Sequence, residues 1–206
     1  MSVHTASTTP KPPETGHPRR TAILALMSAC TVLTVALVAA INLALPSLAA
    51  DALRPSSSRL LWIVDAYVIV FACLLIPAGA FGDRFGRKGT LIGGLAVFAL
   101  GCVLAAVAPT VPVLIAGRAL SGAGAALIMP ATLSIVVHVF PPDRRAQAIA
   151  TWTAATGAAG VVGNIGGGLV LQYLSWRGLF WLVAPAALVL LALTARLAPK
   201  VARHES

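Results

Sequence analysis

Long runs of apolar residues that are almost free of charge restrict this chain to one environment. No charged residue occurs in residues 21–50, and a helix needs only about 20 apolar residues to cross a bilayer. Of the 206 residues, 58% are hydrophobic and 10% are charged, whereas a soluble domain is about half apolar and about one quarter charged. We therefore expect a polytopic membrane protein.

Short polar or proline-containing segments divide the apolar sequence into six predicted spans. The spans are 21–50, 60–81, 90–108, 111–140, 147–173 and 178–195, within a bundle of residues 21–198. Residues 1–20 are rich in Thr, Pro and Ser and are expected to form a disordered cytoplasmic tail, and residues 199–206 a second tail. The predicted fold is an all-α bundle of six transmembrane helices.

The lysines and arginines outside the spans predict the orientation. Three lie on the side opposite to the termini, namely Arg54, Arg59 and Arg177, and eleven lie on the side of the termini. Because cytoplasmic loops carry the excess of Lys and Arg, both termini are expected in the cytoplasm. The basic residues behind the net charge of +9 thus lie where they orient the spans in the membrane, and we expect no nucleic acid as a partner.

The segment between the second and third apolar runs combines glycine with charge. Its notable residues are Gly79, Gly82, Asp83, Arg84, Gly86, Arg87 and Lys88. Glycines allow backbone conformations closed to other residues, and the cations suit an anionic cytoplasmic interface. We expect a short, tightly turned loop. A merely basic loop would explain the cations but neither the glycines nor Asp83.

Two charged residues fall inside the predicted spans. Asp65 and Arg118 lie at matching depths, about 8–10 Å below the outer surface at about 1.5 Å per helical residue. Charges in hydrocarbon are costly and mark functional sites by default. One interpretation is a cavity in which Asp65 takes a proton or a cationic substrate while Arg118 tunes its proton affinity. The alternatives are a static ion pair or side chains that reach toward the outer interface.

Other chemistry finds little support in the sequence. Cys30, Cys73 and Cys102 lie in apolar runs, as small buried hydrophobes do. The four histidines have no ligand spacing, so no metal site is expected. The sequence has no nucleotide-binding loop, so we do not expect ATP to be the energy source. It has no Ser–His arrangement or paired aspartates at one depth, so we do not expect an enzyme.

Six segments in order resemble the major facilitator superfamily, and in particular its drug/proton antiporter branch with fourteen spans. They are residues 41–46, 61–67, 79–88, 117–126, 163–168 and 175–177. The sequence departs from the branch at three positions. Leu37 stands where an acidic residue is common, Ser121 where glutamine is common, and Asn164 where proline is usual.

The resemblance implies the N-terminal half of a transporter that exports amphipathic, cationic compounds. The implied energy source is a proton gradient with no cofactor, and the implied location is a bacterial-type plasma membrane. Asp65 and Arg118 would couple the proton, and segment 79–88 would control conformational switching. Helix packing would involve Asn42, Pro46, Gly122, Gly124, Gly163, Gly167 and Gly168, since small residues let helices approach closely in lipid.

The length of the chain leaves a second function open. The family binds substrate between two six-span halves, and this sequence provides one. The alternative is a truncated or half-size membrane protein that does not transport unless a partner half or a second copy joins it.

Overall fold

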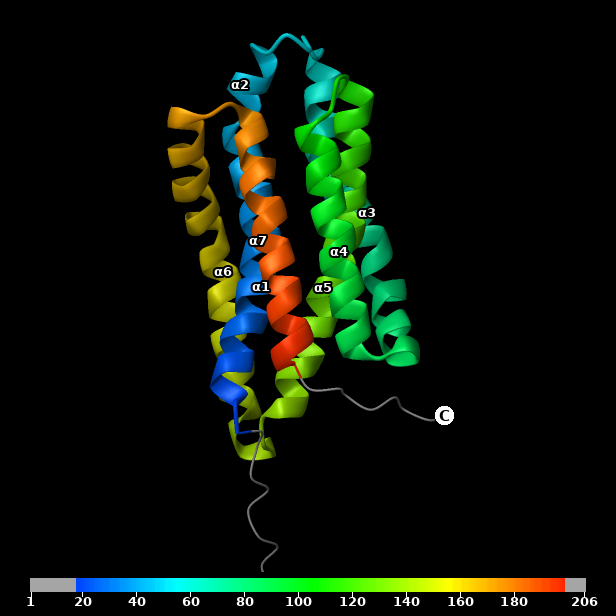
Figure 1. Ribbon diagram of the computed structural model, residues 1–206, viewed down its shortest axis with the longest axis vertical. Helices are drawn as coiled ribbons and strands as arrows, with labels where there is room; N and C mark the ends of the chain where they lie inside the picture. The colour runs from blue at the N-terminus through cyan, green and yellow to red at the C-terminus, as the bar shows by residue number, and fades with distance from the viewer. Residues whose placement is uncertain (1–17, 199–206) are drawn as a thin grey trace, which may run out of the picture.

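The computed structural model describes residues 18–198 as a bundle of helices (Figure 1). Its helices are α1 (Arg20–Leu43), α2 (Leu45–Ala49), α3 (Ser57–Phe85), α4 (Arg87–Ala106), α5 (Val111–Val139), α6 (Pro142–Tyr173) and α7 (Trp176–Leu197). All except the short α2 are long and apolar enough to cross a membrane. The predicted all-α fold with six spans is confirmed. Nearly all of the two expected tails lies outside the described residues.

The first predicted span is broken near its outer end. Instead of one helix over residues 21–50, α1 ends at Leu43 and the short α2 follows Ala44. Pro46 explains the break, because it has no N–H to offer to the carbonyl of Asn42 and its ring crowds that carbonyl.

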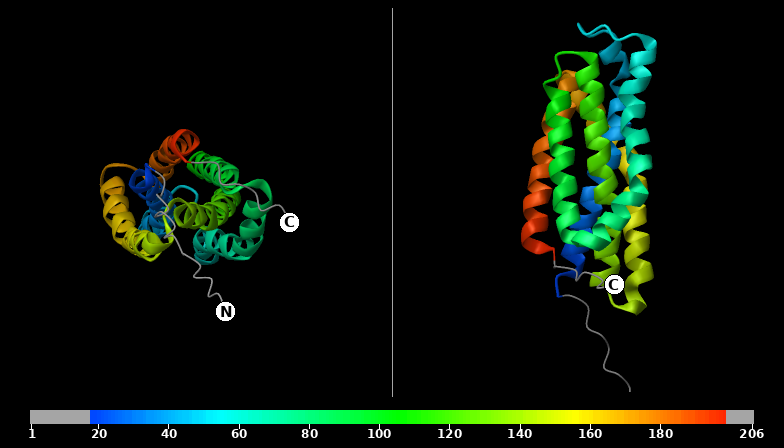
Figure 2. Two further views of the ribbon diagram at one scale, coloured as in Figure 1. Left: turned by 90° about the horizontal axis from the view of Figure 1, so that it is seen from below. Right: turned by 90° about the vertical axis from the view of Figure 1, so that its right-hand side faces the viewer.

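Two central helices each carry one edge helix. The edge helix α3 packs mainly against α5, and the edge helix α6 packs mainly against α1. Seen along the bundle, α1, α6 and α7 form one group and α3, α4 and α5 form the other (Figure 2). Exchanging α1, α3 and α4 with α5, α6 and α7, in that order, turns the α3–α5 contact into the α6–α1 contact. This is expected when the first three spans and the last three spans are repeats of inverted topology.

The core lies where α1, α4, α5 and α7 meet. Met27, Phe98, Ile128 and Phe180 are all inaccessible to solvent there. The edge helices α3 and α6 are different, because only 17% of the most apolar window of each is buried, compared with 56% for α4 and α5. Each edge helix therefore presents a broad uncovered face.

Candidate functional site

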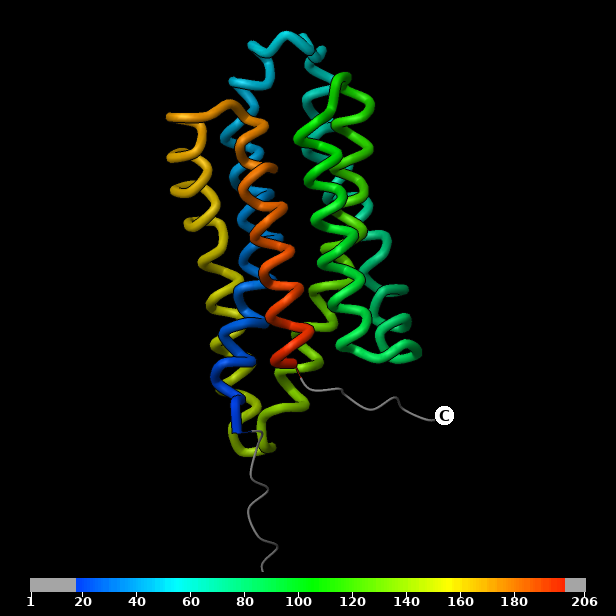
Figure 3. Tube along the Cα trace, viewed as in Figure 1, coloured from blue at the N-terminus to red at the C-terminus, as the bar shows by residue number. Residues whose placement is uncertain are grey.

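The segment between α3 and α4 turns at a single residue. Gly86 has φ +90° and separates the end of α3 at Phe85 from the start of α4 at Arg87, and the chain reverses sharply there (Figure 3). A side chain would be strained at this φ. The expected tight turn is therefore present, but it is confined to Gly86, since residues 79–85 continue α3.

Arg87 folds back over the last turns of α3. Its guanidinium donates to the Asp83 carboxylate and, over 3.3 Å, to the carbonyl oxygen of Gly79. A Cβ at Gly82 would lie 2.9 Å from Nη1 of Arg87, so Gly82 provides the space for this side chain. The charge pair therefore joins the end of α3 to the start of α4 across Gly86.

Lys88 points away from this pair and reaches α7. Its Nζ donates to the carbonyl oxygens of Ala195 at 2.8 Å and Ala198 at 2.6 Å, which belong to the unpaired C-terminal carbonyls of a helix. Lys88, which the sequence analysis placed at the cytoplasmic interface, thus also links two helices. Arg84 instead lies over the ring of Phe85, 5.6 Å from its centroid.

The opposite end of the bundle holds a matching link that the sequence analysis missed. Nη1 of Arg177 donates to the carbonyl oxygens of Ala106 and Ala108, both at 2.9 Å, at the C-terminal end of α4. Lys88 and Arg177 are each the second residue of their helix. The available signal was that each is followed by glycine, Gly89 and Gly178. The antiparallel helices α4 and α7 are thus joined at both ends.

Asp51 extends the link around Arg177 to the loop after α2. Its carboxylate accepts hydrogen bonds from Nε1 of Trp176 and from the backbone N–H of Leu53, each at 3.0 Å. Partial burial opposes ionisation, but these two bonds and the charge of Arg177 together lower the pKa of Asp51 below its ordinary value.

The two charges inside the spans do not share a cavity. Arg118 is fully buried between α3 and α5, where its Nε donates to the carbonyl oxygen of Ile63 at 3.1 Å. Asp65 lies at the same depth but is exposed, on the side of α3 opposite to Ile63 and Tyr67 at about 100° per residue. No ion pair joins Asp65 to Arg118 within residues 18–198. The predicted shared cavity and the alternative ion pair are therefore both absent from this part of the chain.

Most of the predicted packing glycines lie at close helix contacts. A Cβ at Gly122 would collide with the carbonyl oxygen of Tyr67, and one at Gly163 with the carbonyl oxygen of Ala36. Gly124 and Gly167 are similarly restricted by Phe98 and Ala40. Such contacts let the helix backbones approach one another.

Three predicted packing residues differ from this pattern. Gly168 makes only an ordinary contact, because its Cβ would lie 3.6 Å from a methyl group of Leu43. Asn42 is exposed and donates to Val38 in its own helix at 2.8 Å. Pro46 acts on the backbone by ending α1.

The glycines that bring α4 and α5 together include three that were not predicted. Cβ atoms at Gly94, Gly101 and Gly117 would each lie within 3.0 Å of an atom of the facing helix. Gly101 follows Gly94 by seven residues, and Gly124 follows Gly117 by seven. This spacing keeps each pair on one side of its helix and was the signal in the sequence.

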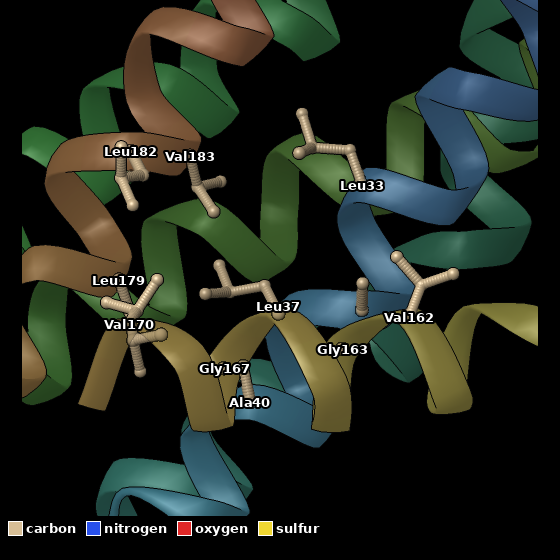
Figure 4. Close-up of a pocket in the computed structure, with 12 residues that line it drawn as sticks. Leu33, Leu37, Ala40, Val162, Gly163, Gly167, Val170, Leu179, Leu182 and Val183 are labelled. Carbon is tan, nitrogen blue, oxygen red and sulfur yellow. The ribbon is translucent and has the colours of Figure 1, made fainter. Parts of the chain in front are cut away.

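An apolar cavity of about 230 Å³ lies between α1, α6 and α7 (Figure 4). Leu37, Gly166 and Leu182 are representative of its lining, which contains only aliphatic side chains and glycine. With no titratable group in its lining, this cavity does not provide a proton site.

A bundle of six helices that are long and apolar enough to cross a membrane, with a charged turn after the second span, defines a multi-pass membrane protein. The sequence model of the Major Facilitator Superfamily matches residues 26–206, so the chain belongs to this superfamily. It is a multi-pass membrane protein of bacterial type, in a family of transporters.

The relatives include bacterial resistance proteins. The chain is 42% identical to the multidrug efflux pump LfrA of Mycolicibacterium smegmatis, over 76% of this chain and 31% of the relative. It is 39% identical to a methylenomycin A resistance protein of Streptomyces coelicolor, over 71% of this chain and 31% of the relative. The chain thus spans about a third of the length of these relatives.

Solved structures agree on the fold. A crystal structure of the peptide transporter POT aligns with a TM-score of 0.75 and 21% sequence identity, over 89% of this chain and 39% of that one. At this identity the likeness concerns the arrangement of the helices alone.

Proposed function

We propose that the chain forms one of the two six-span bundles of a proton-coupled exporter of amphipathic cations. The observation that carries the proposal is Asp65, an exposed carboxylate within the membrane-spanning helix α3 that has no hydrogen-bond or ionic partner in the described residues. An acidic group at this depth is costly unless it binds a proton or a cation. The efflux and resistance activities of the relatives support the same assignment.

The second bundle covers the uncovered faces of α3 and α6. Alternating access needs two bundles that rock about a shared site, and the uncovered face of α3 carries Asp65. With the second bundle in place, that carboxylate borders a cavity between the bundles instead of lipid. A chain without a second bundle does not transport and self-associates through these faces.

The remaining assignments concern energy and switching. The proton gradient drives transport, and both termini lie in the cytoplasm, because Lys and Arg are concentrated on their side of the membrane. The Asp83–Arg87 pair and Lys88 then lie at the cytoplasmic surface, far from Asp65. They act on the exchange between conformations and do not contact the substrate.

The experiment joins residues 1–198 to the remaining C-terminal part of LfrA, which supplies a second bundle. Inverted vesicles with this chimera should take up a fluorescent cation when a proton gradient is applied. Asp65→Asn should abolish the uptake at equal expression, whereas Asp143→Asn, which changes an exposed carboxylate in the first turn of α6, should not. Uptake by the Asp65→Asn chimera at the unmodified rate contradicts the proposed role of Asp65.

A further inference from the structure

Tyr67 on α3 contacts two other helices through three separate parts of the residue. Its ring lies beneath the guanidinium of Arg118, with 4.5 Å between Cζ and the ring centroid. Its hydroxyl donates to the carbonyl oxygen of Thr34 on α1 at 3.1 Å. Its backbone packs directly against Gly122 on α5. Only 4% of the residue is exposed.

The ring compensates a charge that has few other partners. Arg118 is fully buried, and its Nη1 and Nη2 have no hydrogen-bond partner among the described residues. Its Nε has one neutral acceptor, the carbonyl oxygen of Ile63. A cation over an aromatic face is attracted by the ring quadrupole, and more strongly when both are removed from water. Since Asp65 faces away, Tyr67 is the side chain that stabilises this cation within the described part.

The hydroxyl links helices that otherwise contact each other little. The edge helix α3 packs on α5 and only slightly on α1, so the bond from Tyr67 to Thr34 is a specific connection between α3 and α1. One turn away on α1, Thr31 receives a hydrogen bond from Thr156 of α6 at 3.3 Å. Through its hydroxyl, Tyr67 is thus bonded to the central helix on which the other edge helix packs.

We propose that Tyr67 is the positioning residue for Arg118. Its ring holds the guanidinium in place, and its hydroxyl transmits that position to α1. The ring and the hydroxyl thus have separate roles, and the role of the ring depends on the charge at position 118.

The first test is a double-mutant cycle on the purified chain in lipid nanodiscs, with thermal unfolding as the measurement. Tyr67→Leu should lower Tm by at least about 4 °C when Arg118 is present and by much less in the Arg118→Met background. Phe71 provides the matched control, because it stacks on Tyr67 with centroids 6.4 Å apart without a ring contact to Arg118. Phe71→Leu should lower Tm equally in both backgrounds.

An equal loss from Tyr67→Leu in both backgrounds overturns the proposal, because Tyr67 would then be an ordinary packing residue. If Tyr67→Leu alone does not fold, Arg118→Met should restore folding, and failure to do so also counts against the proposal. Tyr67→Phe keeps the ring and should fold with a Tm close to that of the unmodified chain.

The second test addresses the hydroxyl and rests on the proposed transport function. In the chimera with LfrA, Tyr67→Phe should lower the maximal uptake rate per folded protein several-fold and leave the half-saturating concentration of the fluorescent cation unchanged. A rate equal to that of the unmodified chimera overturns the role of the hydroxyl. If the unmodified chimera does not transport, the proposed function fails, while the double-mutant cycle still decides how Tyr67 and Arg118 interact.

Discussion

The helix pair α4–α7 and the edge helices α3 and α6 are held in the bundle in different ways. A cation near the N-terminus of α4 binds the last carbonyls of α7, and one near the N-terminus of α7 binds the last carbonyls of α4. The edge helices instead each rest mainly on one neighbour, α5 for α3 and α1 for α6. The difference indicates that α4 and α7 form a fixed pair, whereas α3 and α6 have other faces that are available to a second bundle.

The largest expected effect is at the contact that attaches α6. A Cβ at Gly163 would collide with the carbonyl oxygen of Ala36 in the backbone of α1, which cannot move aside. Gly163→Ala should therefore destabilise the chain by about 3 kcal/mol, measured as thermal unfolding in detergent. Gly160 is the control, because a Cβ there meets no atom within 4 Å, and Gly160→Ala should be neutral or slightly stabilising. Equal effects of the two changes would mean that α6 is not seated on α1 at Gly163.

The next effect tests the links between α4 and α7. Lys88→Met and Arg177→Met each remove hydrogen bonds from a charged donor, and each should cost about 1.5–3 kcal/mol. The links lie about 30 Å apart along a 20-residue helix, so the two losses should add. The measurement is hydrogen exchange of the backbone amides. Exchange should become faster at the last turn of α7 in Lys88→Met and at the last turn of α4 in Arg177→Met. Arg84→Met should leave both ends unchanged, and if it has the same effect, the fixed pair is not held by these links.

The turn between the two kinds of helix should show a smaller effect. Gly86 has φ +90°, so Gly86→Ala should cost about 1–2 kcal/mol. Gly89, three residues later, is helical with open space around it, and Gly89→Ala should stabilise α4 by about 0.5–1 kcal/mol. The difference between the two Tm values measures the backbone strain of a side chain at position 86. An unchanged Tm in Gly86→Ala would show that the turn is not fixed by that φ.

The smallest expected effect concerns the pH dependence of the outer link. The pKa of Asp51 is lowered in the folded chain, so its contribution to stability is present above the pKa of the unfolded chain. That contribution disappears as the pH falls through the lower, folded pKa, below about pH 4. The loop after α2 should then separate from Trp176, and the tryptophan fluorescence should change. Asp51→Asn should remove this change, and an identical acid titration in that variant would contradict the role of Asp51.

The features of the fold that depend only on neighbouring residues in the sequence were predicted, and those that depend on distant segments were not. The six spans were predicted because hydropathy and charge along the chain determine what crosses a bilayer. The depth of Asp65 and Arg118 followed from counting residues, and the bond from Arg118 to Ile63, two residues from Asp65, agrees with it. The direction in which each side chain points depends on the neighbouring helix, so the burial of Arg118 and the exposure of Asp65 were not predicted.

Contacts between distant segments were equally hidden. Lys88 bonds to a carbonyl 107 residues further along the chain, and no local pattern names that acceptor. The end of α3 was misplaced for a different reason, because glycine permits a turn without requiring one. Gly79 and Gly82 remain helical and only Gly86 leaves the helix. The role of Gly82 is the space it leaves for Arg87, which depends on the fold around it.

The three native cysteines test the central distinction between the closed interior and the uncovered edge helices. Cys30 on α1 and Cys102 on α4 are buried, whereas Cys73 on α3 is exposed. The measurement is the rate at which a membrane-permeant maleimide modifies each thiol in the purified chain, followed by mass spectrometry of its peptides. The structure predicts that Cys73 is modified faster than Cys30 and Cys102, which should react only after unfolding. Modification of Cys102 or Cys30 as fast as Cys73 in the folded chain would contradict it.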